Sequence, residues 1–465
     1  MKLRVLSEAP AGVWTTVQFL TKEQRASLQP PPSEGEFSGG VGSLLMERSA
    51  ATLYVGIGTA LEVDATGMRR AAASAALELR KRGKENVILD LREFPEWAEG
   101  AVEGTVLGAY RFDTFLPEKS RPLAGLVVLV KKTVLKAVEK SAQRGVVLGD
   151  CANAARQMGN MPGNYVYPEA LAKEAALLAK KSGLQCRILD EKSLKAGKFG
   201  GILAVGQGSA RGPRLIALEH LGGKKGEAPL VLVGKAITFD TGGISIKPAA
   251  SMEEMIFDKC GGMAVLGAMK AIAALGLRKN IVGILAAAEN MPSGSAYRPG
   301  DIITMLSGTT VEIVNTDAEG RMVLGDAIHW GRTHYKAAKI INLATLTGAC
   351  GVALGETTAG VWSNNAEFQA DVLRAAEQVG ERLWPMPSHD EYSEKIKSRV
   401  AQIKNSGGRM GGACTAAAFL KVFAGKTPWV HVDIAYTARQ DKDSHGLASG
   451  ATGFGVRTLV RLAEM

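Results

Sequence analysis

The chain has 465 residues, of which 46% are apolar and 22% are charged, so it can bury sizeable cores and is not intrinsically disordered. This length exceeds that of one ordinary domain and favours two. The net charge of +10 permits an attraction to nucleic acid, but no long lysine or arginine run concentrates it, so the charge also fits an ordinary basic protein.

The cysteines and the apolar runs indicate in which cellular compartment the protein is expected. Five cysteines lie far apart and form no C-x-x-C pair, which argues against a disulfide framework or a cysteine zinc site and favours a reducing environment. The first twelve residues have too short an apolar stretch for a signal peptide, and no apolar run approaches the length of a membrane span. We therefore expect a cytoplasmic protein that does not associate with membranes.

The first part of the chain alternates strand and helix patterns. Apolar runs at 51–58, 86–91 and 125–130 are typical of buried strands, and the alanine-rich stretch 67–83 predicts a helix between the first two. The proline-rich stretch 27–36 predicts an exposed loop. This alternation predicts a smaller N-terminal α/β domain over residues 1–135.

A helical pattern then leads into a second α/β region. We expect a connecting helix over residues 136–160, ended by the turn-forming stretch GNMPGN at 159–164. The larger C-terminal domain, 161–465, is expected to have a central mixed sheet flanked by helices. Helices are predicted at 171–183 and 263–276, and strands at 214–220, 229–235, 280–290, 309–315, 338–346 and 429–435.

Several common catalytic signatures are missing. The chain has no G-x-x-x-x-G-K-[ST] loop and no G-x-S-x-G elbow. His329 and His334 are five residues apart but lack the glutamate of H-E-x-x-H. Phosphate-loop, serine-elbow and histidine-zinc chemistries are therefore excluded on motif grounds, and acidic and basic residues at strand ends remain.

Polar residues follow several predicted strands. The strand 229–235 leads into AITFDTGGISIKP, which supplies Lys235, Asp240 and Lys247, and Asp258 precedes a glycine pair and a helix. In open α/β sheets ligands bind at the carboxyl ends of the strands. We therefore expect these side chains to meet in one pocket.

The stretch NTDAEGR (315–321) places charged residues at every second position after an apolar run. In extended chain Asp317, Glu319 and Arg321 would face the same way. Clustered carboxylates repel one another, and hard divalent cations about 3.5–4 Å apart can neutralise them. Alternatively, the stretch is a solvated turn with salt bridges. The acids available for two metals are Asp240, Asp258, Asp317 and Glu319.

The motifs VGKAITFDTGGISIKP, ENMPSGSAYRPGDI, NTDAEGRMVLGDA, NLATLTGA and DIAYTAR closely resemble those of the cytosolic leucine aminopeptidase family. The resemblance covers most of residues 150 to 465 and is weaker over the first 135, where AVEGTVLGAYRFD (101–113) is the best match. It implies a macro-like N-terminal domain and a two-metal aminopeptidase that removes N-terminal residues from peptides.

The resemblance also implies the metal ligands. Lys235 and Asp258 would bind the metal that receives the substrate amino group, Asp240 and Glu319 would bridge both metals, and Asp317 would bind the other. The metals would be zinc or manganese, with magnesium or cobalt possible at one site. Lys235 has to be neutral to act as a ligand, and burial beside dications favours that form.

Two further residues would be catalytic without binding metal. Lys247 would stay protonated and stabilise the oxyanion of the tetrahedral intermediate. No histidine or spare carboxylate stands out as a general base. The resemblance implies a bicarbonate ion in that role, held by the Arg321 guanidinium and by backbone N–H groups including that of Leu346.

The substrate pocket is implied only in outline. By motif position Met255, Thr345 and Gly348 would form its wall, although Met255 could equally be core filler. An apolar pocket would favour leucine or methionine at the substrate N-terminus. The chain departs from the family pattern at Ile256, where lysine is common, and at Tyr436, where glycine is usual. The tyrosine would reshape the pocket rim. Lys259, with Cys260 after it, adds positive charge beside Asp258 and is expected to influence the choice of metal.

The resemblance implies a homohexamer whose inner cavity admits only short peptides. Two alternatives stay open. A carboxylate cluster also serves two-metal phosphoesterases. The positive net charge would allow an additional DNA-binding role, as in some members of this family.

Overall fold

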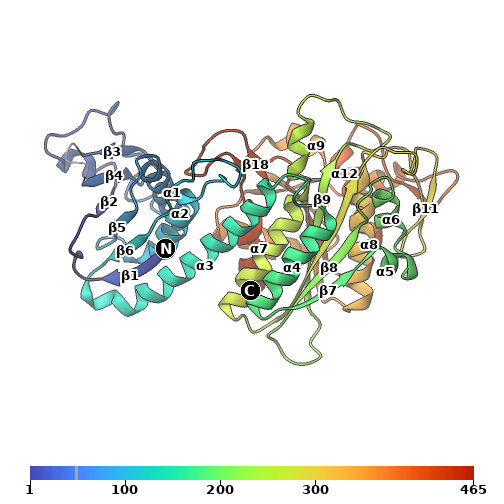
Figure 1. Cartoon of the computed structure of the whole chain (residues 1–465), viewed down its shortest axis with the longest axis horizontal. Helices are drawn as coiled ribbons and strands as arrows, with labels where there is room; N and C mark the ends of the chain where they lie inside the picture. The colour runs from blue at the N-terminus through green and yellow to red at the C-terminus, as the bar shows by residue number, and fades with distance from the viewer. Residues whose placement is uncertain (48–50) are drawn as a thin grey trace. The chain divides into compact units, whose positions relative to one another are not determined.

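The computed structural model describes residues 1–47 and 51–465 of the chain (Figure 1). It contains two compact units, Met1–Asn153 with Asp441–Gly450, and Ala154–Gln440 with Ala451–Met465. Both units are α/β, as expected. The expected domain boundaries stay a prediction, because a compact unit need not be an independently folding domain.

The first unit is a six-stranded sheet with helices. Its strands are β1 (Lys2–Leu6), β2 (Thr15–Leu20), β3 (Leu44–Met46), β4 (Thr52–Gly56), β5 (Asn86–Asp90) and β6 (Gly125–Leu129). Its helices are α1 (Ala65–Lys81), α2 (Ala98–Ala109), the beginning of α3 (Leu135–Asn160), and the 3-10 helices η1 (Gln24–Ser27), η2 (Pro95–Trp97) and η3 (Lys132–Val134).

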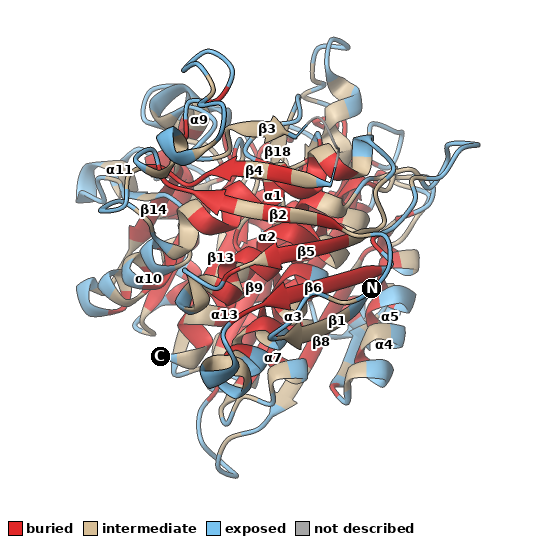
Figure 2. Cartoon of the chain, turned by 90° about the vertical axis from the view of Figure 1, so that its left-hand side faces the viewer, coloured by how far each residue is buried: buried red, intermediate tan, exposed pale blue. Residues whose placement is uncertain are grey.

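This sheet has the strand order β1-β6-β5-β2-β4-β3. The strands run parallel except β3, which pairs antiparallel with β4 at the edge. The predicted strands at 51–58, 86–91 and 125–130 and the predicted helix at 67–83 are confirmed. Figure 2 shows how far β5 and β6 are buried, as their continuous apolar runs indicate. The sequence pattern missed α2, because this helix is buried on nearly every side and lacks an amphipathic period.

The second unit contains the larger sheet. Its strands are β7 (Gln185–Leu189), β8 (Arg214–Leu221), β9 (Leu230–Asp240), β10 (Asn280–Asn290), β11 (Ile302–Thr304), β12 (Thr310–Glu312), β13 (Lys339–Ala344), β14 (Ala359–Ser363), β15 (Leu383–Pro385), β16 (Ile403–Lys404) and β17 (Trp429–Asp433). A short pair, β18 (Arg439–Gln440) and β19 (Gly450–Ala451), follows. Its helices are α4 (Pro168–Ser182), α5 (Glu191–Ala196), α6 (Gly200–Gly206), η4 (Met252–Lys259), α7 (Cys260–Leu275), α8 (Glu319–His334), α9 (Gly348–Leu354), α10 (Ala366–Gln378), α11 (Asp390–Glu394), α12 (Gly412–Ala424) and α13 (Val456–Glu464).

The eight-stranded sheet has the order β15-β14-β17-β13-β9-β10-β8-β7. The central strands β17, β13, β9 and β10 are parallel, whereas β8 and β14 pair with them antiparallel. The predicted mixed sheet is therefore confirmed. The carboxyl ends of four neighbouring parallel strands meet at one edge, which is where ligands bind in such sheets.

Helices cover both faces of this sheet, and β9 shows which residues face which helix. A Cβ added to Gly234 would lie 2.5 Å from the Cα of Gly262 in α7, so Gly234 faces α7. A Cβ added to Gly331 in α8 would lie 3.0 Å from Val231, so Val231 faces α8. Since side chains alternate along a strand, Lys235 lies on the α8 side.

One predicted strand differs from the structure. A strand was predicted over 309–315, but only Thr310–Glu312 forms β12, which pairs with β11 and β16 in a separate three-stranded sheet. Val314 is 40% exposed, so it contributes little to a core. None of the described helices combines the length and apolar character that crossing a membrane requires.

A buried polar group ties β13 to β17. Trp429 Nε1 donates to Asn342 Oδ1 at 2.8 Å, and Asn342 Nδ2 lies 2.8 Å from His431 Nδ1. Since the tryptophan N–H can only donate, it orients the amide so that Asn342 Nδ2 donates to the ring nitrogen. His431 is fully buried and stacks on Trp362 and Trp429. The imidazole is therefore held neutral, with its proton on Nε2.

Acidification is expected to destabilise the protein through His431. Burial lowers the pKa of His431 to about 3 from its ordinary value of 6.5. The unfolded chain therefore takes up a proton below pH 6.5 that the folded chain accepts only near pH 3. This linkage lowers the free energy of unfolding by up to about 1.4 kcal/mol per pH unit across that window. Urea unfolding at pH 7.5, 5.5 and 4.5 in EDTA should show a shallower decline for His431→Gln, and parallel profiles would contradict the assignment.

Candidate metal centre

Lys235 and Asp240 come from the same strand, β9, and a bulge turns them to the same side. They are five residues apart, and an odd spacing in a regular strand places side chains on opposite faces. β9 pairs regularly with β10 as far as Ile237 opposite Ala288, but the next matched pair is Asp240 opposite Asn290. β9 therefore contains one extra residue, which brings Asp240 to the face that carries Lys235.

The loop after β9 returns Lys247 to the carboxylates. Its Nζ lies 3.0 Å from Asp240 Oδ2 and 2.5 Å from Asp317 Oδ1. Burial opposes the ammonium charge, but the surrounding carboxylates, Asp240 first among them, raise the pKa of Lys247 above its ordinary value. The side chain is 23% exposed, so a charged donor remains accessible from the cavity.

The motif NTDAEGR is not extended, so the expected alternation of side chains was wrong. Residues 313–318 belong to no strand or helix and include a turn at Thr316 and Asp317, and α8 begins at Glu319. Asp317 lies just before the helix, and Glu319 and Arg321 lie in its first turn. The extended form is lost because the strand already ends at Glu312. The side chains reach one site because the turn delivers the start of α8 to the carboxyl end of β9.

Lys235 lies at the centre of the cluster. It is 3% exposed, and its Nζ lies 2.8 Å from Asp258 Oδ1 and 2.7 Å from Glu319 Oε1. A Cβ on Gly320 would come within 2.7 Å of this nitrogen, so the glycine of the motif leaves room for the lysine. Burial opposes the charge, but the carboxylates, Asp258 first, raise the pKa of Lys235 above its ordinary value. Without cations Lys235 therefore keeps its proton, which it must lose to act as a ligand.

Thr345 connects Asp258 with Lys235. Its carbonyl oxygen accepts a hydrogen bond from Lys235 Nζ at 2.8 Å, and its Oγ1 donates to Asp258 Oδ1 at 2.7 Å. The other carboxylate oxygen, Asp258 Oδ2, is buried without a hydrogen-bond partner among the described residues. Burial raises the pKa of Asp258 well above its ordinary value.

The cluster fits divalent cations. Asp240, Asp317 and Glu319 each offer an oxygen, and these atoms lie within 4.8 Å of one another. Asp317 Oδ1 and Glu319 Oε1 are buried and meet lysine ammonium groups at ion-pair distance but not in hydrogen-bond geometry. Four carboxylates, counting Asp258, thus face two ammonium groups, and burial with this surplus of negative charge raises the pKa of Asp317 to about 6. Oxygen-rich, negatively charged sites of this kind suit hard cations.

Several supporting residues were missed by the sequence analysis. Asn290 Nδ2 donates to Asp240 Oδ1 at 2.8 Å and to the Thr316 carbonyl at 3.1 Å, and Tyr297 donates its hydroxyl to the same carbonyl at 2.8 Å. These bonds hold the carboxylate and the turn before α8 in place. Asn290 ends a predicted strand, so the strand-end argument could have found it; Tyr297 carries no such signal.

Arg321 lies beside the cluster without contacting its carboxylates directly. Its Nη1 donates to the Asn405 carbonyl at 2.7 Å, and its Nε is buried without a hydrogen-bond partner among the described residues. Burial lowers the pKa of Arg321 to about 10, which leaves the guanidinium charged at neutral pH. The unpaired N–H and the first turn of α8, which no side chain caps, are suited to an anion.

The Leu346 N–H, which was expected to help hold that anion, donates instead to Asp433 Oδ1 at 3.1 Å. Asp433 is 1% exposed and also accepts from Thr347 Oγ1 at 2.6 Å and from the Ala435 N–H at 3.2 Å. The sequence analysis did not single out this aspartate. It fixes the segment after β13 to the segment after β17, and so positions Thr345 beside the cluster.

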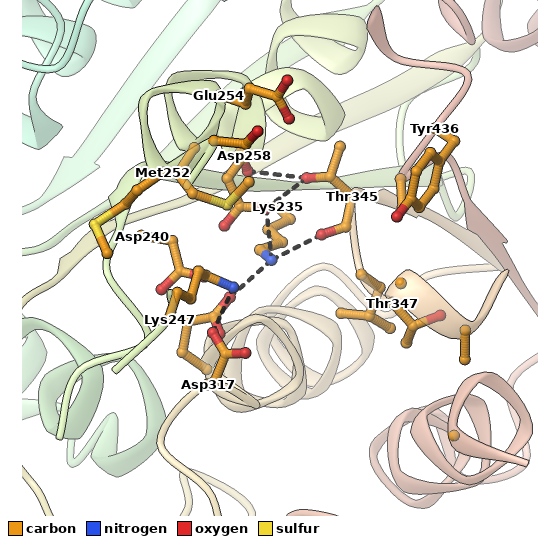
Figure 3. A pocket seen from close by; sticks show the side chains of 18 of the residues that line it. Lys235, Asp240, Lys247, Met252, Glu254, Asp258, Asp317, Thr345, Thr347 and Tyr436 are labelled. Carbon is orange, nitrogen blue, oxygen red and sulfur yellow. Dashed lines mark hydrogen bonds and ion pairs between the residues drawn. The ribbon is translucent and has the colours of Figure 1, made fainter. Parts of the chain in front are cut away.

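The cluster opens into a cavity of about 660 Å³, drawn in Figure 3. The three expected pocket residues, Met255, Thr345 and Gly348, all line it. Further lining residues that the sequence analysis did not single out are Met252, Glu254, Ala435 and Arg439. Tyr436, which was expected to reshape the pocket rim, also lines the cavity. Glu254 and Arg439 form an ion pair of 2.5 Å, so their charges neutralise each other within the lining.

Lys259, one of the departures from the family pattern, is fully buried and points its Nζ at the carbonyl oxygens of Met161 and Ile256. Burial lowers the pKa of Lys259 to about 8. It is not among the described residues that line the cavity, so its influence on metal choice stays a prediction.

The fold and the site together define a two-unit α/β enzyme with an acidic, lysine-containing centre suited to divalent cations at the carboxyl end of a mixed sheet. Comparison with protein families is more specific. Residues 153–460 match the catalytic domain of the cytosol aminopeptidase family, and residues 7–119 match its N-terminal domain. The chain belongs to this metal-dependent family and is an aminopeptidase, a hydrolase of peptides.

Similar proteins agree with this assignment. A probable cytosol aminopeptidase of Syntrophotalea carbinolica is 46% identical over 428 residues, which cover 90% of this chain and 86% of that protein. One of Cenarchaeum symbiosum is 46% identical over 416 residues, covering 88% and 85%. The solved structure of the bottromycin maturation enzyme BotP in complex with Mn matches with a TM-score of 0.87 at 31% identity, covering 98% of this chain and 99% of that one.

Proposed function

We propose that this aminopeptidase uses two divalent cations to release apolar N-terminal residues, leucine and methionine among them, from short peptides. The observation that carries the proposal is the buried group of carboxylates around Lys235 and Lys247, beside a cavity with an apolar wall. Such a surplus of buried negative charge is costly unless cations neutralise it.

The ligand assignment follows the family resemblance. Lys235 and Asp258 would hold one cation, Asp317 the other, and Asp240 and Glu319 both. Zinc or manganese is proposed, with magnesium or cobalt possible at one site; the BotP structure with Mn supports a divalent cation on this fold. Bound there, the cations would polarise the scissile carbonyl and make hydroxide available near neutral pH.

Lys247 and Arg321 are proposed to act without binding metal. The Lys247 ammonium is accessible from the cavity and can donate a hydrogen bond to the developing oxyanion, where a positioned donor contributes most. The Arg321 fork would hold a bicarbonate ion, which supplies the general base that no side chain at the site provides. The unpaired Arg321 Nε supports this role, whereas the Leu346 N–H is engaged by Asp433.

Replacement of Arg321 by alanine is expected to lower kcat by about 10²-fold or less, because an anion would be misplaced rather than a cation lost. Added bicarbonate should restore part of the activity, and metal content should not change. The matched control is Arg409→Ala, which removes an exposed arginine that also lines the cavity. Unchanged wild-type kinetics in bicarbonate-free buffer would argue against the anion.

The function is tested with a panel of aminoacyl-p-nitroanilides and metal analysis of the purified protein. We expect two cations per chain and higher kcat/KM for leucine and methionine than for charged residues. A single cation, or a preference for charged N-termini, would contradict the proposal. Hydrolysis of bis(p-nitrophenyl) phosphate without hydrolysis of the p-nitroanilides would favour the phosphoesterase alternative.

Two partner assignments stay predictions. A homohexamer would restrict entry to short peptides, and light scattering of the purified protein measures its mass directly. Binding to DNA would rest on the net charge of +10 alone, and a salt-sensitive gel shift on duplex DNA would test it.

A further inference from the structure

The aromatic ring of Tyr436 forms part of the cavity wall. It is the sole aromatic side chain among the described residues that line the cavity. The side chain is 38% exposed, and its hydroxyl has no hydrogen-bond partner within the described parts of the chain. In Figure 3 it lies on the far side of the charged cluster from Met252, beside Thr345 and Thr347.

The ring rests on a glycine face of α9. A Cβ added to Gly351 would lie 2.0 Å from Cδ2, 2.2 Å from Cε2 and 2.6 Å from Cγ of Tyr436. The ring edge therefore occupies the space that any other side chain at position 351 would need. One turn earlier, a Cβ on Gly348 would lie 4.0 Å from the Tyr436 hydroxyl. The ring thus lies along the helix instead of projecting across the cavity.

The same segment is tied to the reacting centre. Asp433 accepts hydrogen bonds from Ala435 on one side and from Leu346 and Thr347 on the other. Thr345, next in the chain, contacts Lys235 and Asp258. The ring is therefore held at a set position relative to the groups proposed to bind the substrate N-terminus, which limits the entropy lost when a side chain packs against it.

We propose that Tyr436 is a specificity-determining residue that favours aromatic N-terminal residues, such as phenylalanine, over small ones. The inference rests on the proposed function and names one substrate class within it. A ring that lies along the wall leaves the cavity of about 660 Å³ open to a large side chain and offers it an aromatic surface. Offset or edge-to-face contact between two rings adds to the ordinary burial of apolar area.

The test is the ratio of kcat/KM for phenylalanyl- and alanyl-aminomethylcoumarin, measured with metal-loaded full-length protein. We expect Tyr436→Gly to lower this ratio about three- to tenfold, the range that an aromatic pair contributes. Tyr436→Phe should retain the ratio because it keeps the ring, whereas Tyr436→Leu should lower it although it keeps an apolar side chain. An unchanged or increased ratio in Tyr436→Gly would overturn the proposal, since the ring would then contribute nothing to binding of the phenylalanyl side chain or would hinder it.

A double-mutant cycle tests whether the absence of a side chain at Gly351 holds the Tyr436 ring in its position against α9. Gly351→Ala should displace Tyr436 and lower the ratio in the native background, but should change it less than twofold in Tyr436→Gly, because the clashing partner is gone. If Gly351→Ala changed the ratio equally in both backgrounds, the proposed position of the ring against Gly351 would be wrong. Failure of the proposed function is distinguishable, because wild-type protein would then hydrolyse neither substrate or would do so without cations.

Discussion

Removal of divalent cations with EDTA is expected to abolish peptide hydrolysis, and added zinc or manganese to restore it. Asp240, Asp317 and Glu319 each place an oxygen within 4.8 Å of the others, and among the described residues the ammonium groups of Lys235 and Lys247 form ion pairs with them. In the structure those ammonium groups contact carboxylate oxygens that are proposed to bind metal. The measurement is kcat/KM after chelation and dialysis, with metal content determined on the same sample.

Two controls accompany the chelation experiment. The unfolding temperature should fall on chelation, because a ligand that binds only the folded state stabilises it. The circular dichroism spectrum should keep its α/β character. The hydrophobic core between the sheet and its helices includes none of the proposed metal ligands, so it does not depend on bound cations. Full activity in protein shown to be free of metal would refute the two-cation proposal.

The variant Glu319→Gln is expected to lower kcat/KM by about 10³-fold or more and, when both proteins are compared in EDTA, to leave the unfolding midpoint nearly unchanged. Glu319 is 2% exposed, and its Oε1 meets Lys235 Nζ at 2.7 Å without hydrogen-bond geometry. Glutamine keeps the shape of the side chain but removes the negative charge that a bridging ligand supplies. The measurements are steady-state kinetics, metal stoichiometry and the unfolding midpoint.

The matched control is Glu381→Gln, which changes another buried glutamate. Glu381 is 3% exposed and accepts hydrogen bonds from the Gly455 N–H and the Thr458 hydroxyl, outside the cavity. This substitution should cost about 1–3 kcal/mol of stability and leave kcat nearly unchanged. The two variants are therefore expected to differ in opposite ways: Glu319→Gln in activity and Glu381→Gln in stability. Near-normal kcat in Glu319→Gln would show that Glu319 is not a bridging ligand.

Charged residues from separate motifs were expected to meet in one pocket, and they do, but one of them arrives by a different conformation. The seven charged residues selected from three motifs do meet beside one cavity. For NTDAEGR, however, the physical reason was wrong. Alternation along extended chain was expected, but Glu319 and Arg321 belong to the first turn of α8. The order of residues along the chain did not distinguish the two conformations, because a short apolar run before polar residues fits both.

The sequence by itself determined which charged side chains are available to the site. Its motifs supplied the carboxylates and lysines, and its apolar periodicity supplied three of the six strands of the first sheet and five of the eight strands of the second. The absence of other signatures excluded phosphate-loop, serine-elbow and histidine-zinc mechanisms. These features are local, so a reading of neighbouring residues recovers them.

Only the tertiary structure decided how those groups face one another. The extra residue in β9 brings Asp240 to the side of Lys235, Asp433 engages the Leu346 N–H, and Gly351 makes room for the ring of Tyr436. Each of these depends on a partner distant in the chain: strand pairing with β10, the end of β17, or the surface of α9. A β-bulge, or a close approach between a backbone and a side chain, costs free energy locally and persists because packing elsewhere compensates for that cost. No pattern of neighbouring residues therefore predicts it.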